Sequence, residues 1–96
     1  MLNFKYLPKE IEPRQFCRIW FGLDKLSAKE LDQCETETGY RANCVKVLSR
    51  VLKVSPRAVR NWGEGLEFER IPQHYKQSLG YALDAAKNRS RIATAA

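Results

Sequence analysis

The chain has 96 residues, of which 44% are hydrophobic and 29% are charged, and its formal net charge is +6. This length and composition are typical of one small globular domain and exclude both a second, catalytic domain and a disordered chain. The apolar runs are only a few residues long, against the roughly 20 needed to cross a bilayer, and residues 1–13 contain no secretory signal. We therefore expect a cytoplasmic protein without a membrane partner.

Residues suited to metal binding or catalysis are few. The three cysteines, Cys17, Cys34 and Cys44, are an odd number at wide spacing, which indicates a reducing compartment, and the single histidine is His74. Without close ligand pairs we expect no metal and no cofactor; Cys17 and Cys44 should be buried thiols and His74 a surface residue. No glycine-rich phosphate loop and no nucleophile with its base can be proposed, so we expect the protein not to be an enzyme.

The first elements in chain order are an N-terminal arm and one helix. Residues 1–12 are too short to build a sheet and are predicted to form the arm. Pro13 is a favourable first helical position, and Gly22 is a common signal for a helix end. The side chains that repeat at helical spacing between them, and should face inward, are Phe16, Ile19 and Trp20.

A second helix is predicted to begin at Ser27, because Ser27 and Glu30 have the spacing of a capping box. Leu31 and Cys34 should face inward. The outer surface of this helix is expected to be acidic and to face away from any polyanion; its acids are Glu30, Asp32, Glu35 and Glu37. Gly39 either ends this helix or interrupts it, and we favour a break.

Two further helices are predicted around residues 53–55. The third carries apolar side chains at helical spacing and ends by Lys53: Ala42, Val45, Leu48, Val51 and Leu52. Ser55 as N-cap and Pro56 at the first helical position start a fourth helix, which we expect to reach Trp62 before Gly63 or Gly65 stops it. The two helices are thus joined by a very tight turn.

After a polar loop at residues 64–70, Pro72 opens a fifth helix that is expected to fade at Asn88. Its apolar face is Tyr75, Leu79, Ala82, Leu83 and Ala86. Residues 89–96 are predicted to be a flexible tail. The fold class is therefore all-α: a helical domain of about five helices over residues 13–88, with a central helix-turn-helix.

The positive charge is concentrated in one segment. Residues 41–63 contain six basic residues and no acidic residue: Arg41, Lys46, Arg50, Lys53, Arg57 and Arg60. Such a segment is expected in a protein that binds polyanions, although a solvated helical face gives the same pattern. The apolar residues of the segment decide between these two interpretations.

Residues 45–65 contain what two steeply crossing short helices require. Ser49 is the small residue at the crossing, and Val59 and Trp62 form a pair directed back at the first helix. The apolar side chains that line the turn are Leu48, Leu52 and Val54. On the opposite side of the fourth helix lie three side chains suited to reading base edges: Arg57, Arg60 and Asn61.

This pattern resembles the helix-turn-helix DNA-binding domains of the Cro and cI repressor type. The matching residues are Ser49, Leu52-x-Val54-Ser55 and Ala58-Val59-x-x-Trp62-x-x-Gly65. That family usually has glycine where this chain has Lys53, so we expect Lys53 to adopt left-handed backbone at a cost of roughly 1 kcal/mol. The connection over residues 65–72 is longer than in the family, which predicts a different packing angle for the fifth helix.

The resemblance implies that the helix from Ser55 to Trp62 enters the major groove. Its base-contacting residues would be Arg57, Arg60 and Asn61. The residues in contact with the DNA backbone would be Arg41, Lys46, Arg50, Lys53 and Ser55. The protein would then be a sequence-specific regulator of transcription, with a repressor as the expected kind, located at the nucleoid.

Proteins of this kind commonly dimerise to read two half-sites of double-stranded DNA, so we expect a homodimer. The candidate interface is the fifth helix, with Tyr81 and Leu83, or the N-terminal arm. Two alternatives remain open. One is a DNA-binding subunit of a larger phage or mobile-element machine for packaging or transposition. The other is a protein–protein adaptor, although an adaptor should present an apolar face where this chain is basic and polar.

Overall fold

The computed structural model describes residues 10–95, with side chains as far as residue 86, and this part of the chain forms five helices and no strand. The helices are α1 (Pro13–Trp20), α2 (Ala28–Glu35), α3 (Tyr40–Leu52), α4 (Pro56–Arg60) and α5 (Gln73–Ala95). The expected all-α class with a central helix-turn-helix is confirmed. Most of the predicted N-terminal arm, residues 1–9, lies outside the described residues.

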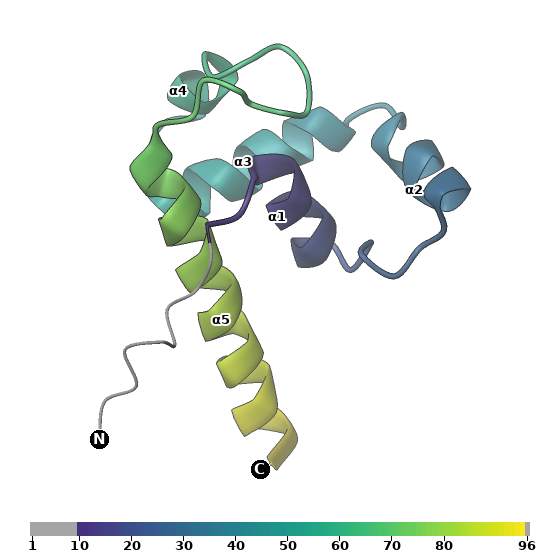
Figure 1. Ribbon diagram of the computed structural model, residues 1–96, viewed down its shortest axis with the longest axis vertical. Coiled ribbons are helices and arrows are strands. Elements are labelled where there is room, and N and C mark those ends of the chain that lie inside the picture. Colours follow the sequence, from purple (N-terminus) through teal and green to yellow (C-terminus); the bar gives the residue numbers. More distant parts are fainter. Residues whose placement is uncertain (1–9, 96) are drawn as a thin grey trace.

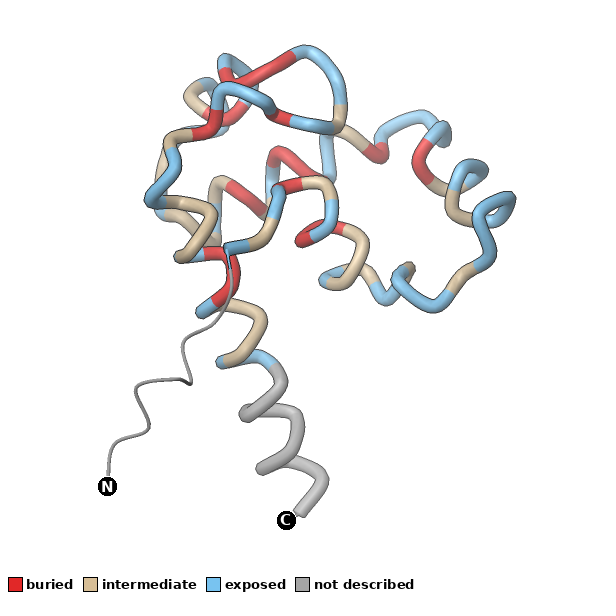
Figure 2. The backbone as a smooth tube through the Cα atoms, in the orientation of Figure 1, coloured by how far each residue is buried: buried red, intermediate tan, exposed pale blue. Residues whose placement is uncertain are grey.

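The longest helix within the body of the protein, α3, lies at its centre and packs against each of the other four helices (Figure 1). The buried core cluster draws residues from α1, α3, α4, α5 and the loop before α5, and Figure 2 marks buried positions along the backbone of these elements. The side chains that are completely buried include Phe16, Leu48, Val59, Phe68 and Leu79. Each such burial is worth about 1.5–3 kcal/mol relative to exposure. One continuous core therefore fixes α4 relative to the other helices.

Local signals in the sequence set the starts of α2 and α3 as expected. The Ser27 hydroxyl accepts a hydrogen bond from the Glu30 N–H at 3.2 Å, and the Glu30 carboxylate accepts one from the Ser27 N–H at 3.3 Å. This is the predicted capping box. Gly39 has a φ of 90°, a left-handed backbone that favours glycine, and α3 begins directly after it. The predicted break at Gly39 is confirmed.

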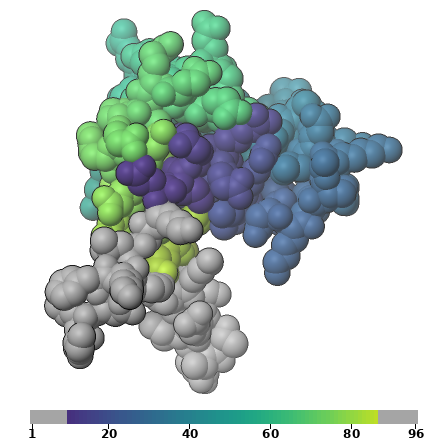
Figure 3. Space-filling model, viewed as in Figure 1, coloured from purple at the N-terminus to yellow at the C-terminus, as the bar shows by residue number. Residues whose placement is uncertain are grey.

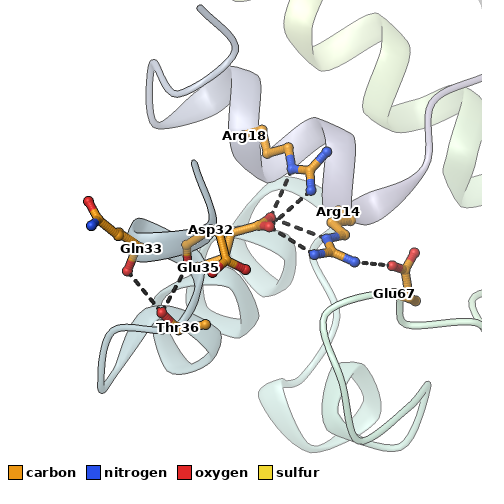
Figure 4. Close-up of polar contacts among 7 residues, drawn as sticks. All are labelled: Arg14, Arg18, Asp32, Gln33, Glu35, Thr36 and Glu67. Atoms are coloured by element: carbon orange, nitrogen blue, oxygen red, sulfur yellow. Dashed lines mark hydrogen bonds and ion pairs between the residues drawn. The ribbon is translucent and has the colours of Figure 1, made fainter. Parts of the chain in front are cut away.

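Glu35 was expected on the acidic outer face of α2, and that expectation is wrong. Its side chain is only 4% exposed and binds both Arg14 and Arg18 of α1 (Figure 4). Glu35 lies one helical turn after Leu31 and so shares the inner face of α2, where the two guanidinium groups replace the water it would lose. Arg14 also contacts Glu67 in the loop between α4 and α5.

Several side chains predicted to face inward lie at the surface instead. The Trp20 side chain is 42% exposed and stacks on Phe16, with ring centroids 5.3 Å apart. The buried residues of α1 are Pro13, Phe16 and Cys17, so Trp20 at the end of the helix covers Phe16 from outside the core. Ala42 and Ala86 are exposed as well.

The fifth helix is longer than expected. It begins at Gln73 and its backbone continues as a helix to Ala95, so the predicted end at Asn88 is wrong. Residue 96, the last of the predicted tail, lies outside the described residues. Alanine has the highest intrinsic helix propensity, and no proline follows Pro72 to stop the helix. The C-terminal part of α5 projects away from the other helices (Figure 1). Among the described residues, no helix is both long and apolar enough for a membrane span.

Candidate nucleic-acid interface

A three-residue turn, Lys53–Ser55, joins α3 to α4. Lys53 has φ 57° and ψ 44°, which confirms the predicted left-handed conformation. Across the turn, the Ser49 hydroxyl donates a hydrogen bond to the Val54 carbonyl at 2.6 Å, and the Val54 N–H donates to the Ser49 carbonyl at 3.1 Å. Ser49 is therefore more than a small residue at the crossing, because its hydroxyl also holds the turn closed.

The inner face of α4 is anchored on the core. The Ser55 hydroxyl caps the helix by accepting a hydrogen bond from the Ala58 N–H at 3.1 Å. Val59 is completely buried, and Trp62 is 8% exposed with its ring against Tyr75 of α5, the centroids 5.5 Å apart. The predicted inward pair of Val59 and Trp62 is confirmed, so the inner face of α4 packs on α3, and Trp62, just after the helix, contacts α5.

The predicted base-contacting residues, Arg57, Arg60 and Asn61, are all exposed. The helix that carries them ends at Arg60 rather than at Trp62. The Asn61 carbonyl at its end accepts hydrogen bonds from the Arg70 guanidinium at 2.8 and 3.1 Å, and the Trp62 N–H bonds to the Val59 carbonyl in a tightened last turn. Arg70, which sequence patterns do not single out, thus fixes the end of α4.

The predicted backbone-contacting residues fall into two groups. The exposed ones are Lys46, Arg50, Lys53 and Ser55. Arg41 is half-buried and its guanidinium group is engaged by the loop after α4: Nε donates to the Gly65 carbonyl at 3.2 Å, and Nη2 donates to the Gly63 carbonyl. The same group lies over the ring of Phe68, 5.3 Å from its centroid. Arg41 therefore has a structural role that the charge pattern does not reveal.

The loop expected to be merely polar contributes to the core. Phe68 is completely buried and has a φ of 45°, a left-handed conformation that is rare for an aromatic residue. Gly63 lies so close beneath this loop that a Cβ there would be 3.3 Å from the Phe68 Cα and the Glu69 nitrogen. A single aromatic residue among charged neighbours has no periodicity, so no sequence signal indicated its burial.

A cavity of about 280 Å³ lies between α3 and α4. Its lining residues are Arg41, Ala42, Val45, Lys46, Pro56 and Arg60. The lining contains three cations and no acid, and none of the six basic residues between 41 and 63 makes an ion pair within the part of the chain that the structure describes. The exposed acids of α2 (blue) lie apart from α4 and the loop after it (green; Figure 3). The loop after α4 carries three exposed acids, Glu64, Glu67 and Glu69, and none of them forms an ion pair with the six basic residues of segment 41–63 among the described residues. The cations of α3 and α4 are thus left without ion-pair partners in the described part of the chain.

The two thiols predicted to be buried are buried, and they meet in the core. A hydrogen bond with Cys44, together with burial, raises the pKa of the Cys17 thiol above its usual range. The Tyr40 hydroxyl is buried too and has no hydrogen-bond partner among the described residues.

No group of three His, Cys, Asp or Glu side chains in the described part of the chain could hold a metal ion. His74 is exposed, as expected for a surface residue.

Comparison of the chain with protein-family models, curated proteins and solved structures finds no match. The function of the α3–α4 surface is therefore inferred from its own charge and geometry.

Proposed function

We propose that this protein binds double-stranded DNA with α4 in the major groove and acts as a sequence-specific regulator of transcription, as a repressor. The observation that carries the proposal is the two-sided character of α4. Val59 holds its inner face in the core, while Arg57 and Asn61 are exposed on the outer face. A rigid mount that presents side chains of this kind is what direct readout of bases requires.

The chemistry of these side chains suits base edges. Arginine donates two hydrogen bonds to guanine O6 and N7, and asparagine pairs with adenine N6 and N7. The side chains of Arg57 and Asn61 form no ion pair and no hydrogen bond within the described residues, so both can bind a ligand. The resemblance of residues 49–65 to the helix-turn-helix domains of the Cro and cI repressor type supports this proposal.

Exposed cations beside α4 would supply the affinity that does not depend on sequence. Lys46, Arg50 and Lys53 flank α4 and have no acidic partner within the described residues. Phosphate contacts from such residues fix the register of a protein on the duplex. Ser55, at the start of α4, can donate its hydroxyl hydrogen to a phosphate while its oxygen caps the helix.

Assembly as a homodimer on DNA belongs to the same proposal, because one short helix spans only a few base pairs. Tyr81 on α5 has a side chain that is 47% exposed, and α5 projects beyond the other helices (Figure 1). A second copy docked along α5 would bring a second α4 helix into the assembly. Location at the nucleoid in the cytoplasm follows from the proposed ligand.

A selection from random duplexes tests the function directly. The protein is mixed with a random-sequence duplex pool, bound molecules are sequenced, and affinity for the best site is measured across a salt series. We expect an enriched site and a log–log salt slope equivalent to roughly three to six phosphate contacts per chain. An affinity for the duplex that does not change with salt concentration, or no binding at about 50 mM salt, would contradict the proposal.

Sedimentation of the protein with its best site tests the dimer. A monomer both free and on DNA would remove the dimer from the proposal while leaving DNA binding intact. Copurification with an ATPase or assembly into rings would instead favour a subunit of a larger DNA machine.

A further inference from the structure

The cavity between α3 and α4 is built from cations on two different helices. Arg41 and Lys46 come from α3, and Arg60 comes from α4. The walls between these cations are apolar: Ala42, Val45 and Pro56. At about 280 Å³ the cavity is at or below the lower limit of roughly 300–1,000 Å³ that is common for small-molecule sites, so it suits one small anionic group better than a cofactor.

One of these cations is held in place before any ligand arrives. The Arg41 guanidinium donates from Nε and Nη2 to the carbonyls of Gly65 and Gly63 and lies over the Phe68 ring. Its Nη1 makes no hydrogen bond within the described residues and can donate to an oxyanion. A fixed donor costs less entropy on binding than a mobile one, so Arg41 gives the cavity a rigid edge.

Helix geometry separates Arg60 from the other exposed residues of α4. At about 100° per residue, Arg57 and Asn61 each lie about 160° from the buried Val59 and point straight outward. Arg60 lies only about 100° from Val59, on the flank that it shares with Pro56. That flank faces the cavity, whose lining includes both residues.

We propose that this cavity seats one backbone phosphate of duplex DNA, held jointly by Lys46 and Arg60 against the fixed guanidinium group of Arg41. The inference rests on the proposed function and refines it. Arg60 becomes a positioning residue, while Arg57 and Asn61 remain the residues that read bases. Three cations without an acid in the lining match a phosphodiester, and a phosphate at the flank of α4 sets the depth and register of that helix in the groove.

The test compares alanine variants on duplexes with and without a neutral linkage. Wild type, Lys46→Ala, Arg60→Ala and the double variant are titrated against the selected duplex and a scrambled one over a salt series. The same proteins are then titrated against duplexes that each carry one methylphosphonate in place of a phosphate. Both side chains are exposed, so all variants should fold, which helical circular dichroism checks.

We expect each single substitution to weaken binding to both duplexes by the same factor, about three- to tenfold, and to lower the salt slope by about one. One methylphosphonate position should abolish the effect of both substitutions, and the double variant should lose less than the product of the two single losses. Lys29→Ala on α2 removes the same charge outside the cavity and should change neither affinity nor slope.

The inference is overturned if Arg60→Ala relaxes preference at one base pair and keeps the wild-type slope. It is also overturned if the two single losses multiply on every duplex, because the residues then hold different phosphates. As a second probe, inorganic phosphate is titrated into the free protein and the NMR shifts of the backbone amides are followed. If the shifts of residues 41–46 change and reach saturation, while no methylphosphonate position abolishes the effect of the substitutions, the cavity binds a free anion and the inference is overturned. A wild-type protein that binds no duplex defeats the proposed function itself, which is a distinguishable result.

Discussion

Glu35 of α2 and Arg18 of α1 form a two-pronged ion pair, with Arg18 Nε 2.8 Å from Glu35 Oε2 and Nη2 2.9 Å from Oε1. Arg14 approaches the same carboxylate at 2.8 and 3.2 Å (Figure 4). Because Glu35 is the only buried residue of α2, this charged cluster rather than apolar packing links α2 to α1. The acid stability of the protein should depend on it.

The hydrogen bonds from Arg18 and Arg14 lower the pKa of Glu35 from its ordinary value of 4.5 to about 2. The unfolded chain therefore binds a proton at higher pH than the folded chain, and stability should fall as pH decreases from about 4.5 to about 2. Glu35→Gln should cost about 3 kcal/mol at pH 7 and flatten this pH dependence. Urea unfolding at several pH values measures both effects, and parallel curves for the variant and wild type would contradict this role of Glu35.

Lys53 occupies left-handed backbone at the end of α3, where glycine carries no steric penalty. Lys53→Gly should raise the free energy of unfolding by about 0.5–1 kcal/mol, since relief of the backbone exceeds the extra entropy of the unfolded chain. Lys46→Gly, in the interior of α3, is the matched control and should lower stability by about 1 kcal/mol. Thermal unfolding compares the two; a destabilised Lys53→Gly protein would show that the lysine side chain stabilises the turn.

Gly63 and Gly65 lie two residues apart in the same loop but in different surroundings. A Cβ at Gly63 would meet the backbone of residues 68 and 69 at 3.3 Å, whereas a Cβ at Gly65 would meet nothing within 4 Å. Gly63→Ala should therefore destabilise the protein by about 1–3 kcal/mol through displacement of Phe68, and Gly65→Ala should be nearly neutral. Equal unfolding midpoints for the two variants would contradict this prediction and show that the loop backbone shifts to accommodate a Cβ at position 63 without loss of stability.

The two proposed base readers should have a signature of their own. Arg57→Ala and Asn61→Ala should each weaken binding to the selected duplex about tenfold or more, relax preference at one base position, and leave binding to a scrambled duplex nearly unchanged. Trp62→Ala serves as a stability control, because loss of a buried anchor costs about 3–5 kcal/mol and removes binding through unfolding. Folded variants with the wild-type specificity ratio would show that the outer face of α4 does not read bases.

Several elements were predictable because their causes lie within a few residues. The Ser27–Glu30 capping box, the break at Gly39 and the start of α4 at Ser55 each follow from hydrogen bonds or backbone limits local to the signal. The orientation of α4 was predictable for a similar reason. A helical period places Val59 opposite Arg57 and Asn61 whatever the rest of the chain does.

Other features depended on partners far away in the sequence, which local patterns do not specify. Glu35 is buried because two arginines of α1 reach it, and Phe68 is buried because it joins the core cluster formed with residues of α1, α3 and α5. Arg41 is committed to the carbonyls of Gly63 and Gly65. The sequence by itself determined where helices begin and which face of α4 is polar. The tertiary structure decided which charges are neutralised and which remain free around the cavity, because that choice depends on how separate elements pack.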